Sequence, residues 1–74
     1  MNYQKIYDNL INSRKNRVLV ENIYYERHHI VMRSMGGTNN SDNLVKLTAR
    51  EHFLAHWLLW RIYRNKETSI AFIS

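Results

Sequence analysis

The sequence predicts a small α+β domain in which one helix is followed by two short antiparallel strands and a second helix. Three observations lead to this class. Apolar residues near the N-terminus have helical spacing, two β-branched segments flank a turn-rich loop, and a long apolar segment begins with helix-capping residues. With 74 residues and no cysteine, the chain has room for one small core that no disulfide can stabilise, so a bound metal ion would strengthen it.

The first helix is expected over residues 2–12, where the apolar side chains fall on one face. The residues of this face are Tyr3, Ile6, Tyr7, Leu10 and Ile11. The polar and basic run at 13–17 should end the helix and form a solvated connection. Residues 1–17 are therefore expected to form an N-terminal helix and a basic connection.

Two strand segments are expected next. Residues 18–31 are rich in β-branched and aromatic side chains and predict an extended segment, and LVKL at 44–47 predicts a short second strand. Between them, residues 34–43 contain Gly36-Gly37 and a cluster of Asn, Ser and Asp, which is turn chemistry. Two strands joined by such a loop form an antiparallel hairpin.

The second helix is expected to begin at a capping box. Thr48 and Glu51 form the T-x-x-E pattern, in which each side chain bonds to the backbone N–H of the other residue. No Gly or Pro interrupts the segment that follows, so the helix should run to Tyr63 or Arg64.

The domain organisation follows from these elements. Residues 18–65 are expected to form the functional core, and residues 66–74 are expected to form an apolar C-terminal segment, as in a chain cut from a longer one. No apolar stretch approaches a membrane span, and the N-terminus lacks the pattern of a signal peptide. We therefore expect no membrane partner and a cytoplasmic location.

The charge of the chain favours a phosphate-rich partner. Eleven Lys and Arg residues against six Asp and Glu residues give a formal net charge of +5 and an isoelectric point near 9.9. Many small basic proteins bind no nucleic acid, so the charge alone does not decide the partner.

The four histidines predict a metal site. In a helix, His52 and His56 lie on one face and can direct their ring nitrogens at one point. His28 and His29 end the first extended segment, and one of them reaches that point if the hairpin packs on the helix. The H-x-x-x-H pattern alone also fits two partly exposed polar residues on an amphipathic helix, so the prediction depends on all four rings.

Three imidazoles around one divalent ion leave a coordination position open, which is typical of a catalytic site. Neighbouring residues of a strand point to opposite faces, so His28 and His29 cannot both be ligands. We assign His28 as the ligand and His29 as a general base near the same phosphate. Three nitrogen donors favour Zn²⁺ or another transition ion, although availability can also bring in Mg²⁺ or Mn²⁺.

These residues carry a resemblance to a known family. The sequences HHI at 28–30, S-x-G-G at 34–37 and DNLVKLTAREHFLAH at 42–56 resemble the HNH nucleases, whose fold is the ββα-metal (His-Me finger) unit. The resemblance covers residues 25 to about 60, with His29, Asn43 and His52 as the ordered His, Asn and His. Many members of the family have a proline soon after the His pair, and this chain has none.

The resemblance implies a metal-dependent endonuclease that hydrolyses DNA phosphodiester bonds in a bacterial or phage-infected cell. His29 would activate water, and Asn43 would hold the hairpin loop and so orient His29. The metal ligands would be His28, His52 and His56, as in the colicin-type branch. A monomer with one such unit should nick DNA, whereas double-strand cleavage would need a weak dimer or a second event.

Three basic residues flank the proposed site. Arg33, Lys46 and Arg50 are expected to contact the DNA backbone, with simple solvation of the charges as the alternative. Aromatic residues could stack on bases, but in so short a chain they are expected to supply buried area. The aromatic residues to which this applies are Tyr24, Tyr25, Trp57 and Trp60.

Two other functions fit the pattern. A zinc-stabilised DNA-binding finger without catalysis would recruit His29 or Asp42 as a fourth ligand. A helical interaction protein without any metal would dock its basic face on an acidic partner. Metal binding that survives His29→Ala separates the nuclease from the finger, and a metal titration separates both from the helical protein.

Overall fold

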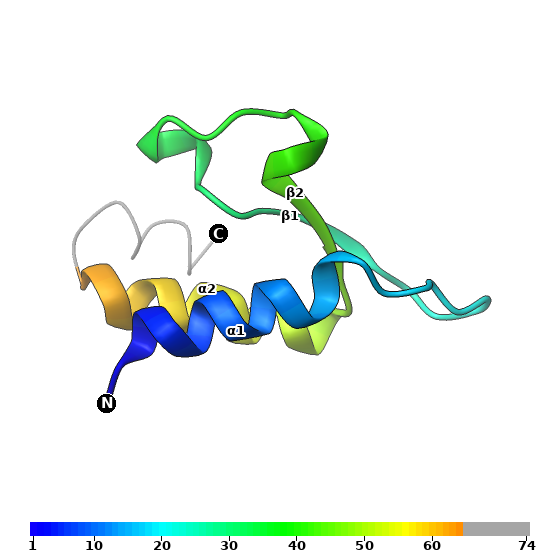
Figure 1. Cartoon of the computed structure of the whole chain (residues 1–74), viewed down its shortest axis with the longest axis horizontal. Coiled ribbons are helices and arrows are strands. Elements are labelled where there is room, and N and C mark those ends of the chain that lie inside the picture. Colours follow the sequence, from blue (N-terminus) through cyan, green and yellow to red (C-terminus); the bar gives the residue numbers. More distant parts are fainter. Residues whose placement is uncertain (65–74) are drawn as a thin grey trace.

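The computed structural model of the chain describes residues 1–64 (Figure 1). Its elements in chain order are α1 (Tyr3–Lys15), β1 (Glu26–His29), β2 (Leu44–Leu47) and α2 (Ala49–Tyr63), with short 3-10 turns at Arg33–Met35 and Ser41–Asn43. The predicted α+β class is confirmed, because a two-stranded antiparallel sheet leads into a helix that carries histidines. The segment expected at 66–74 lies outside the described residues. No helix within residues 1–64 has the length and apolar character that crossing a bilayer requires.

Helix α1 is longer than the apolar pattern predicted. It begins where the Asn2 side chain accepts a hydrogen bond from the Lys5 backbone N–H at 3.0 Å, and it includes Arg14 and Lys15 in its last turn. Cations suit the negative end of a helix dipole. The Arg14 side chain also donates to Glu51 of α2 at 2.6 Å, so the basic run is held against the second helix instead of forming a free connection.

The hairpin is shorter than predicted. β1 and β2 pair antiparallel over four residues each, with His28 opposite Val45 and His29 opposite Leu44. The prediction of an extended strand over residues 18–31 is therefore wrong outside β1, because β2 offers backbone partners to only four residues.

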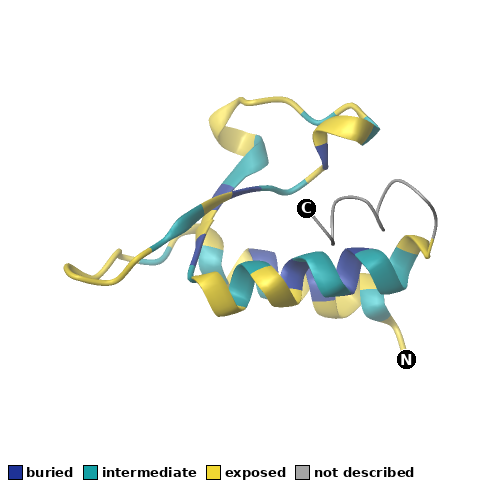
Figure 2. Ribbon diagram, turned by 180° about the vertical axis from the view of Figure 1, so that it is seen from behind, coloured by how far each residue is buried: buried dark blue, intermediate teal, exposed yellow. Residues whose placement is uncertain are grey.

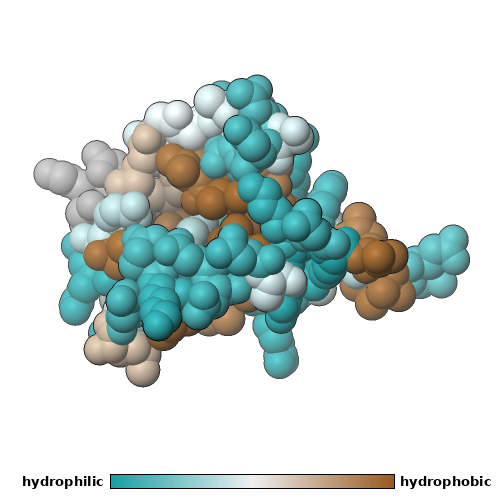
Figure 3. Space-filling model, in the orientation of Figure 1, coloured by the Kyte–Doolittle hydropathy of each residue, from teal (hydrophilic) through white to brown (hydrophobic). Residues whose placement is uncertain are grey.

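The segment between α1 and β1 projects from the body of the molecule. It turns at Asn22, whose φ is 67°, and exposes several large apolar side chains (Figure 3). The exposed residues of this segment are Val18, Leu19, Val20, Ile23 and Tyr24. The expectation that Tyr24 packs in the core is wrong, since 68% of its surface is exposed. Tyr24 lies in this projecting segment, which pairs with no strand among residues 1–64.

The loop between the strands turns tightly at its two glycines. Gly36 has φ of 90°, a left-handed conformation that favours glycine. At Gly37, a Cβ atom would lie 1.8 Å from the Val31 carbonyl oxygen, so no other residue fits without moving the backbone. The close approach lets the Gly37 N–H donate to the Met32 carbonyl at 2.9 Å, which folds the loop back toward β2.

Helix α2 begins at the predicted capping box. The Glu51 N–H donates to Thr48 Oγ1 at 3.2 Å, and the Thr48 N–H donates to Glu51 Oε1 at 2.9 Å. The same carboxylate accepts from Arg14 and Arg17 at 2.6 Å. Hydrogen bonding from Arg17 above all lowers the pKa of Glu51 to about 2, so this charged side chain joins the start of α2 to the end of α1.

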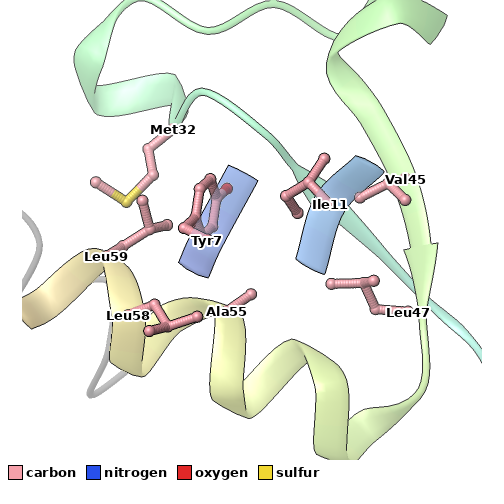
Figure 4. Close-up of a cluster of buried hydrophobic side chains, with 8 residues drawn as sticks. All are labelled: Tyr7, Ile11, Met32, Val45, Leu47, Ala55, Leu58 and Leu59. Atoms are coloured by element: carbon pink, nitrogen blue, oxygen red, sulfur yellow. The ribbon is translucent and has the colours of Figure 1, made fainter. Parts of the chain in front are cut away.

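The core lies between the two helices and the inner face of the hairpin (Figure 4). α1 and α2 run antiparallel and side by side, and the hairpin with its loop arches over them (Figures 1 and 2). Trp57 packs against this core, with its ring edge-on to Tyr3 at a centroid distance of 5.8 Å. The buried apolar residues are Tyr7, Ile11, Met32, Val45, Leu47, Ala55, Leu58 and Leu59.

Candidate metal centre and nucleic-acid site

Three histidines from two elements converge. His28 comes from β1, and His52 and His56 lie one turn apart on α2. One ring nitrogen from each lies within 4.8 Å of the other two, and this is the group among residues 1–64 that could hold a metal ion. The three rings line a cleft of about 330 Å³. The residues that line this cleft are Arg27, His28, His29, Met32, Arg33, Ser34, His52 and His56.

His28 is held neutral and in one orientation. Only 1% of its surface is exposed, and this burial, followed by the nearby charges of His56 and His52, lowers its pKa to about 3. Its Nε2 atom lies 2.9 Å from the Tyr7 hydroxyl oxygen. Its Nδ1 atom is buried and has no hydrogen-bond partner within the described part of the chain. A buried nitrogen without a partner is costly unless it binds something.

His52 is held from its outer side by a carboxylate. Its Nδ1 atom lies 2.7 Å from Glu26 Oε1, and because a carboxylate only accepts, Nδ1 carries the proton and Nε2 carries the lone pair. Hydrogen bonding from His52, and then from the Tyr24 hydroxyl at 2.9 Å, lowers the pKa of Glu26. Glu26 was not predicted as a site residue. Its position two residues before His28 on one strand face was the signal that could have identified it.

His56 completes the group. Its Nε2 atom lies 3.1 Å from Nε2 of His52, and burial followed by the His52 charge lowers its pKa. Two nitrogens bound to one tetrahedral zinc ion at 2.0–2.1 Å would lie about 3.3 Å apart, which is close to this separation. Metal-bound imidazoles usually give their other N–H to a carboxylate or another acceptor, as His52 does here. The donor set therefore fits a late transition ion.

His29 follows His28 but takes a different partner. It lines the same cleft, and its Nε2 atom lies 2.7 Å from the Asn39 side-chain oxygen. An amide oxygen only accepts, so Nε2 carries the proton and Nδ1 is left with a lone pair. Asn39 was treated only as turn chemistry at the sequence level, and no spacing rule in the sequence would have singled it out.

Asn43 ties the loop to the end of β1. Its side-chain oxygen accepts from the Val31 N–H at 2.8 Å, and its amide donates to the carbonyls of Val31 at 3.0 Å and Thr38 at 2.8 Å. Its backbone carbonyl also accepts from the Ile30 N–H at 2.8 Å. Three of these bonds fix the backbone of Ile30 and Val31, which directly follows His29, and the fourth holds the loop at Thr38. The catalytic role expected for Asn43 stays a prediction.

The three predicted DNA-contacting residues lie in different places. Arg33 lines the histidine cleft. Lys46 lies directly opposite Arg27 across the strands and lines a second groove of about 300 Å³, together with Lys15. Arg50 is exposed in the first turn of α2 and lines neither space. Arg27, which borders both spaces, was not predicted.

Comparison with known proteins gives several similar chains. The chain is 56% identical over 68 residues to "Probable mobile endonuclease D" and 51% identical over 72 residues to "Probable mobile endonuclease E", both of Enterobacteria phage T4. It is also 48% identical over 68 residues to "Probable mobile endonuclease C" of the same phage. These alignments cover 88%, 97% and 89% of the chain but only 26%, 50% and 32% of the relatives, so the chain spans half of their length or less. No family model matches the chain, and no solved structure matches it.

Proposed function

We propose that the chain is the catalytic part of a metal-dependent HNH endonuclease that hydrolyses phosphodiester bonds in DNA. The observation that carries this proposal is the convergence of three imidazoles in one cleft that also receives a fourth imidazole from the next residue of β1. The relatives named as mobile endonucleases of a phage support the same activity and a place of action in a phage-infected cell.

One divalent ion is held by His28, His52 and His56 in this proposal. The bound ion would supply Lewis-acid stabilisation of the charge on the phosphate and on the leaving 3′ oxygen. The nitrogen donors favour Zn²⁺ or another transition ion, with Mn²⁺ or Mg²⁺ as replacements when they are abundant. Glu26 keeps the proton of His52 on Nδ1, so that Nε2 faces the cleft with its lone pair.

His29 is the general base. Its Nδ1 atom accepts a proton from the attacking water, because Nε2 is already bonded to Asn39. Asn43 orients His29 through the bonds that it makes to the backbone of Val31. His29 must be neutral to accept the proton, and the ligands must be neutral to bind the ion, so acid should inhibit both steps.

The DNA backbone lies along the basic residues that border the cleft and the outer face of the hairpin. In this proposal Arg33 and Arg27, which line the histidine cleft, hold phosphates beside the scissile bond, and Lys46, which lines the second groove, extends this row away from the cleft. Arg50 contributes at the start of α2. Phosphate contacts position a nucleic acid without reading its sequence, so specificity has to come from elsewhere.

Supercoiled plasmid incubated with the protein and a panel of divalent ions tests this proposal. We expect nicked circles with Zn²⁺, Mn²⁺ or another transition ion, inhibition by EDTA, and a loss of at least about 100-fold for His29→Ala, since general bases contribute about 10²–10⁴. The matched control is Ser34→Ala, which also changes a cleft residue but removes no proposed function. Linear product that appears only after nicked product, and only at high protein concentration, would indicate a monomer that dimerises weakly.

The same variant distinguishes the alternative of a zinc-stabilised finger. Nuclease action requires that His29→Ala keeps its metal affinity and loses cleavage. If His29→Ala instead loses the ion and unfolds, His29 is a fourth ligand and the site is structural. A wild-type protein that binds the ion but leaves plasmid intact under all conditions would also contradict the endonuclease.

A further inference from the structure

Helix α1 reaches the candidate metal site through one side chain. Tyr7 is buried, with 3% of its surface exposed, and it sits in the core between Met32 and the residues of α2 (Figure 4). Its hydroxyl oxygen lies 2.9 Å from His28 Nε2 and 2.7 Å from the Ile30 carbonyl oxygen. Phenylalanine would fill the same apolar space, so the hydroxyl has a role that packing does not require.

The two bonds of this hydroxyl determine the tautomer of His28. A neutral phenol has one proton, and burial raises the pKa of Tyr7, so the proton stays on the oxygen. The Ile30 carbonyl can only accept, and it therefore receives that proton. The hydroxyl oxygen must then accept from His28 at Nε2. Consequently the His28 proton is on Nε2 and the lone pair is on Nδ1.

We propose that Tyr7 is a positioning residue that turns the Nδ1 lone pair of His28 toward the ion, which makes helix α1 a functional part of the metal centre. Nδ1 is the ring atom of His28 that has no hydrogen-bond partner among residues 1–64, so the atom freed by Tyr7 is also the atom that needs a ligand. The inference rests on the proposed metal site and assigns it a partner outside the ββα unit.

Tyr7 and Glu26 then orient two of the proposed ligands in the same way. Each bonds to the outer nitrogen of one imidazole, through a phenol oxygen for His28 and a carboxylate for His52. Partners of this kind typically change metal affinity by about 10–100-fold. His56 has no such partner among the described residues, since its Nδ1 atom is buried without a hydrogen bond. Two of the three proposed ligands are therefore held by a second residue, and His56 is not.

The test compares Tyr7→Phe with Tyr3→Phe. Both variants remove one phenol hydroxyl from α1, but the Tyr3 hydroxyl accepts from Arg61 at 2.8 Å and touches no histidine. Zn²⁺ affinity is measured by competition with a chelator at neutral pH, and circular dichroism checks the fold. We expect affinity to fall by about 10–100-fold in Tyr7→Phe and by less than about twofold in Tyr3→Phe.

A second readout needs no variant and no metal. Nitrogen NMR of the metal-free wild-type protein reports which ring nitrogen of His28 carries the proton, and we expect Nε2. Wild-type protein that binds Zn²⁺ with the His28 proton on Nδ1, or Tyr7→Phe that binds Zn²⁺ as tightly as Tyr3→Phe, would overturn the role of Tyr7 and leave the proposed function intact. Wild-type protein with the proton on Nε2 that binds no divalent ion would overturn the proposed function itself.

Discussion

The two faces of the β1–β2 hairpin differ in how their polar groups are satisfied. On the inner face, His28 is buried and bonded to Tyr7, and Glu26 is bonded to His52. On the outer face, Arg27 and Lys46 lie directly opposite each other and are exposed. Neither makes a side-chain hydrogen bond or ion pair with any described residue. Like charges that face each other across two strands destabilise a sheet.

The eight residues of the two strands therefore serve two purposes, one on each face of the hairpin. In the proposed metal centre the inner face has to be rigid, because each proposed ligand must keep its lone pair on the correct nitrogen before an ion binds. On the outer face, the unpaired charges of Arg27 and Lys46 cost some stability but remain available to bind a polyanion. A strand can carry both arrangements since successive side chains point to opposite faces.

The largest effect is expected from truncating the buried ligand. His28→Ala removes one of three donors and leaves the Tyr7 hydroxyl without its buried partner. We expect Zn²⁺ affinity to fall by at least about 100-fold and the metal-free protein to lose roughly 2–4 kcal/mol of stability, from the cavity and the lost hydrogen bond to Tyr7. Chelator competition and urea unfolding measure the two quantities.

His29→Ala is the matched variant on the next residue. It should leave Zn²⁺ affinity within a few-fold of wild type, because its ring nitrogen bonds to Asn39 and not to another ligand. Equal losses of affinity in the two variants would mean that His29 binds the ion as His28 does.

A smaller effect is expected from pH on the metal-free protein. The pKa of His28 is about 3 in the folded chain, against an ordinary value of 6.5. Below pH 6.5 the unfolded chain binds a proton that the folded chain does not, so stability falls as pH falls, by up to about 1.4 kcal/mol per pH unit and down to about pH 3. Urea unfolding between pH 7.5 and 5 measures this slope before carboxylates titrate.

His28→Gln should remove much of that slope, since glutamine does not titrate and can still donate to Tyr7. His29→Gln should keep it, because His28 remains buried. A wild-type stability that stays constant from pH 7.5 to pH 5 would show that His28 protonates in the folded state as easily as in the unfolded one.

The fold and the pairing of His52 with His56 could be predicted because they depend on local rules. The capping box, the four-residue spacing of His52 and His56 and the turn at Gly36-Gly37 each follow from neighbouring residues. The length of β1 could not be predicted in the same way. It depends on how many partners β2 offers, and residues 18–25 have the composition of a strand but pair with no strand among residues 1–64.

The hydrogen-bond partners of His28 and His29 were missed for a related physical reason. Tyr7 lies 21 residues before His28, and Asn39 lies 10 residues after His29. Such contacts are set by the packing of α1 and by the path of the loop, neither of which leaves a spacing pattern. Tyr7 had the signature of a core residue, and it does pack in the core. Its hydroxyl was the only sign of a second role.

The smallest effect concerns the outer face. Arg27→Ala and Lys46→Ala should each weaken binding of a short DNA duplex by only a few-fold in EDTA, because each removes one phosphate contact among several. The more informative quantity is the slope of log affinity against log salt concentration. Each variant should reduce the magnitude of that slope by about 0.9, the value for one released counterion per phosphate.

Lys5→Ala is the control for this measurement. Lys5 is exposed and lies ten residues before Lys15 on α1, about 15 Å away along the helix, and it lines neither groove. Its loss changes net charge by the same amount as the loss of Lys46, so a general effect of charge would reduce all three slopes equally. A reduction confined to Arg27→Ala and Lys46→Ala would place the DNA backbone on the outer face. If all variants give equal slopes, binding of a polyanion does not explain why Arg27 and Lys46 lie unpaired and opposite each other in the sheet.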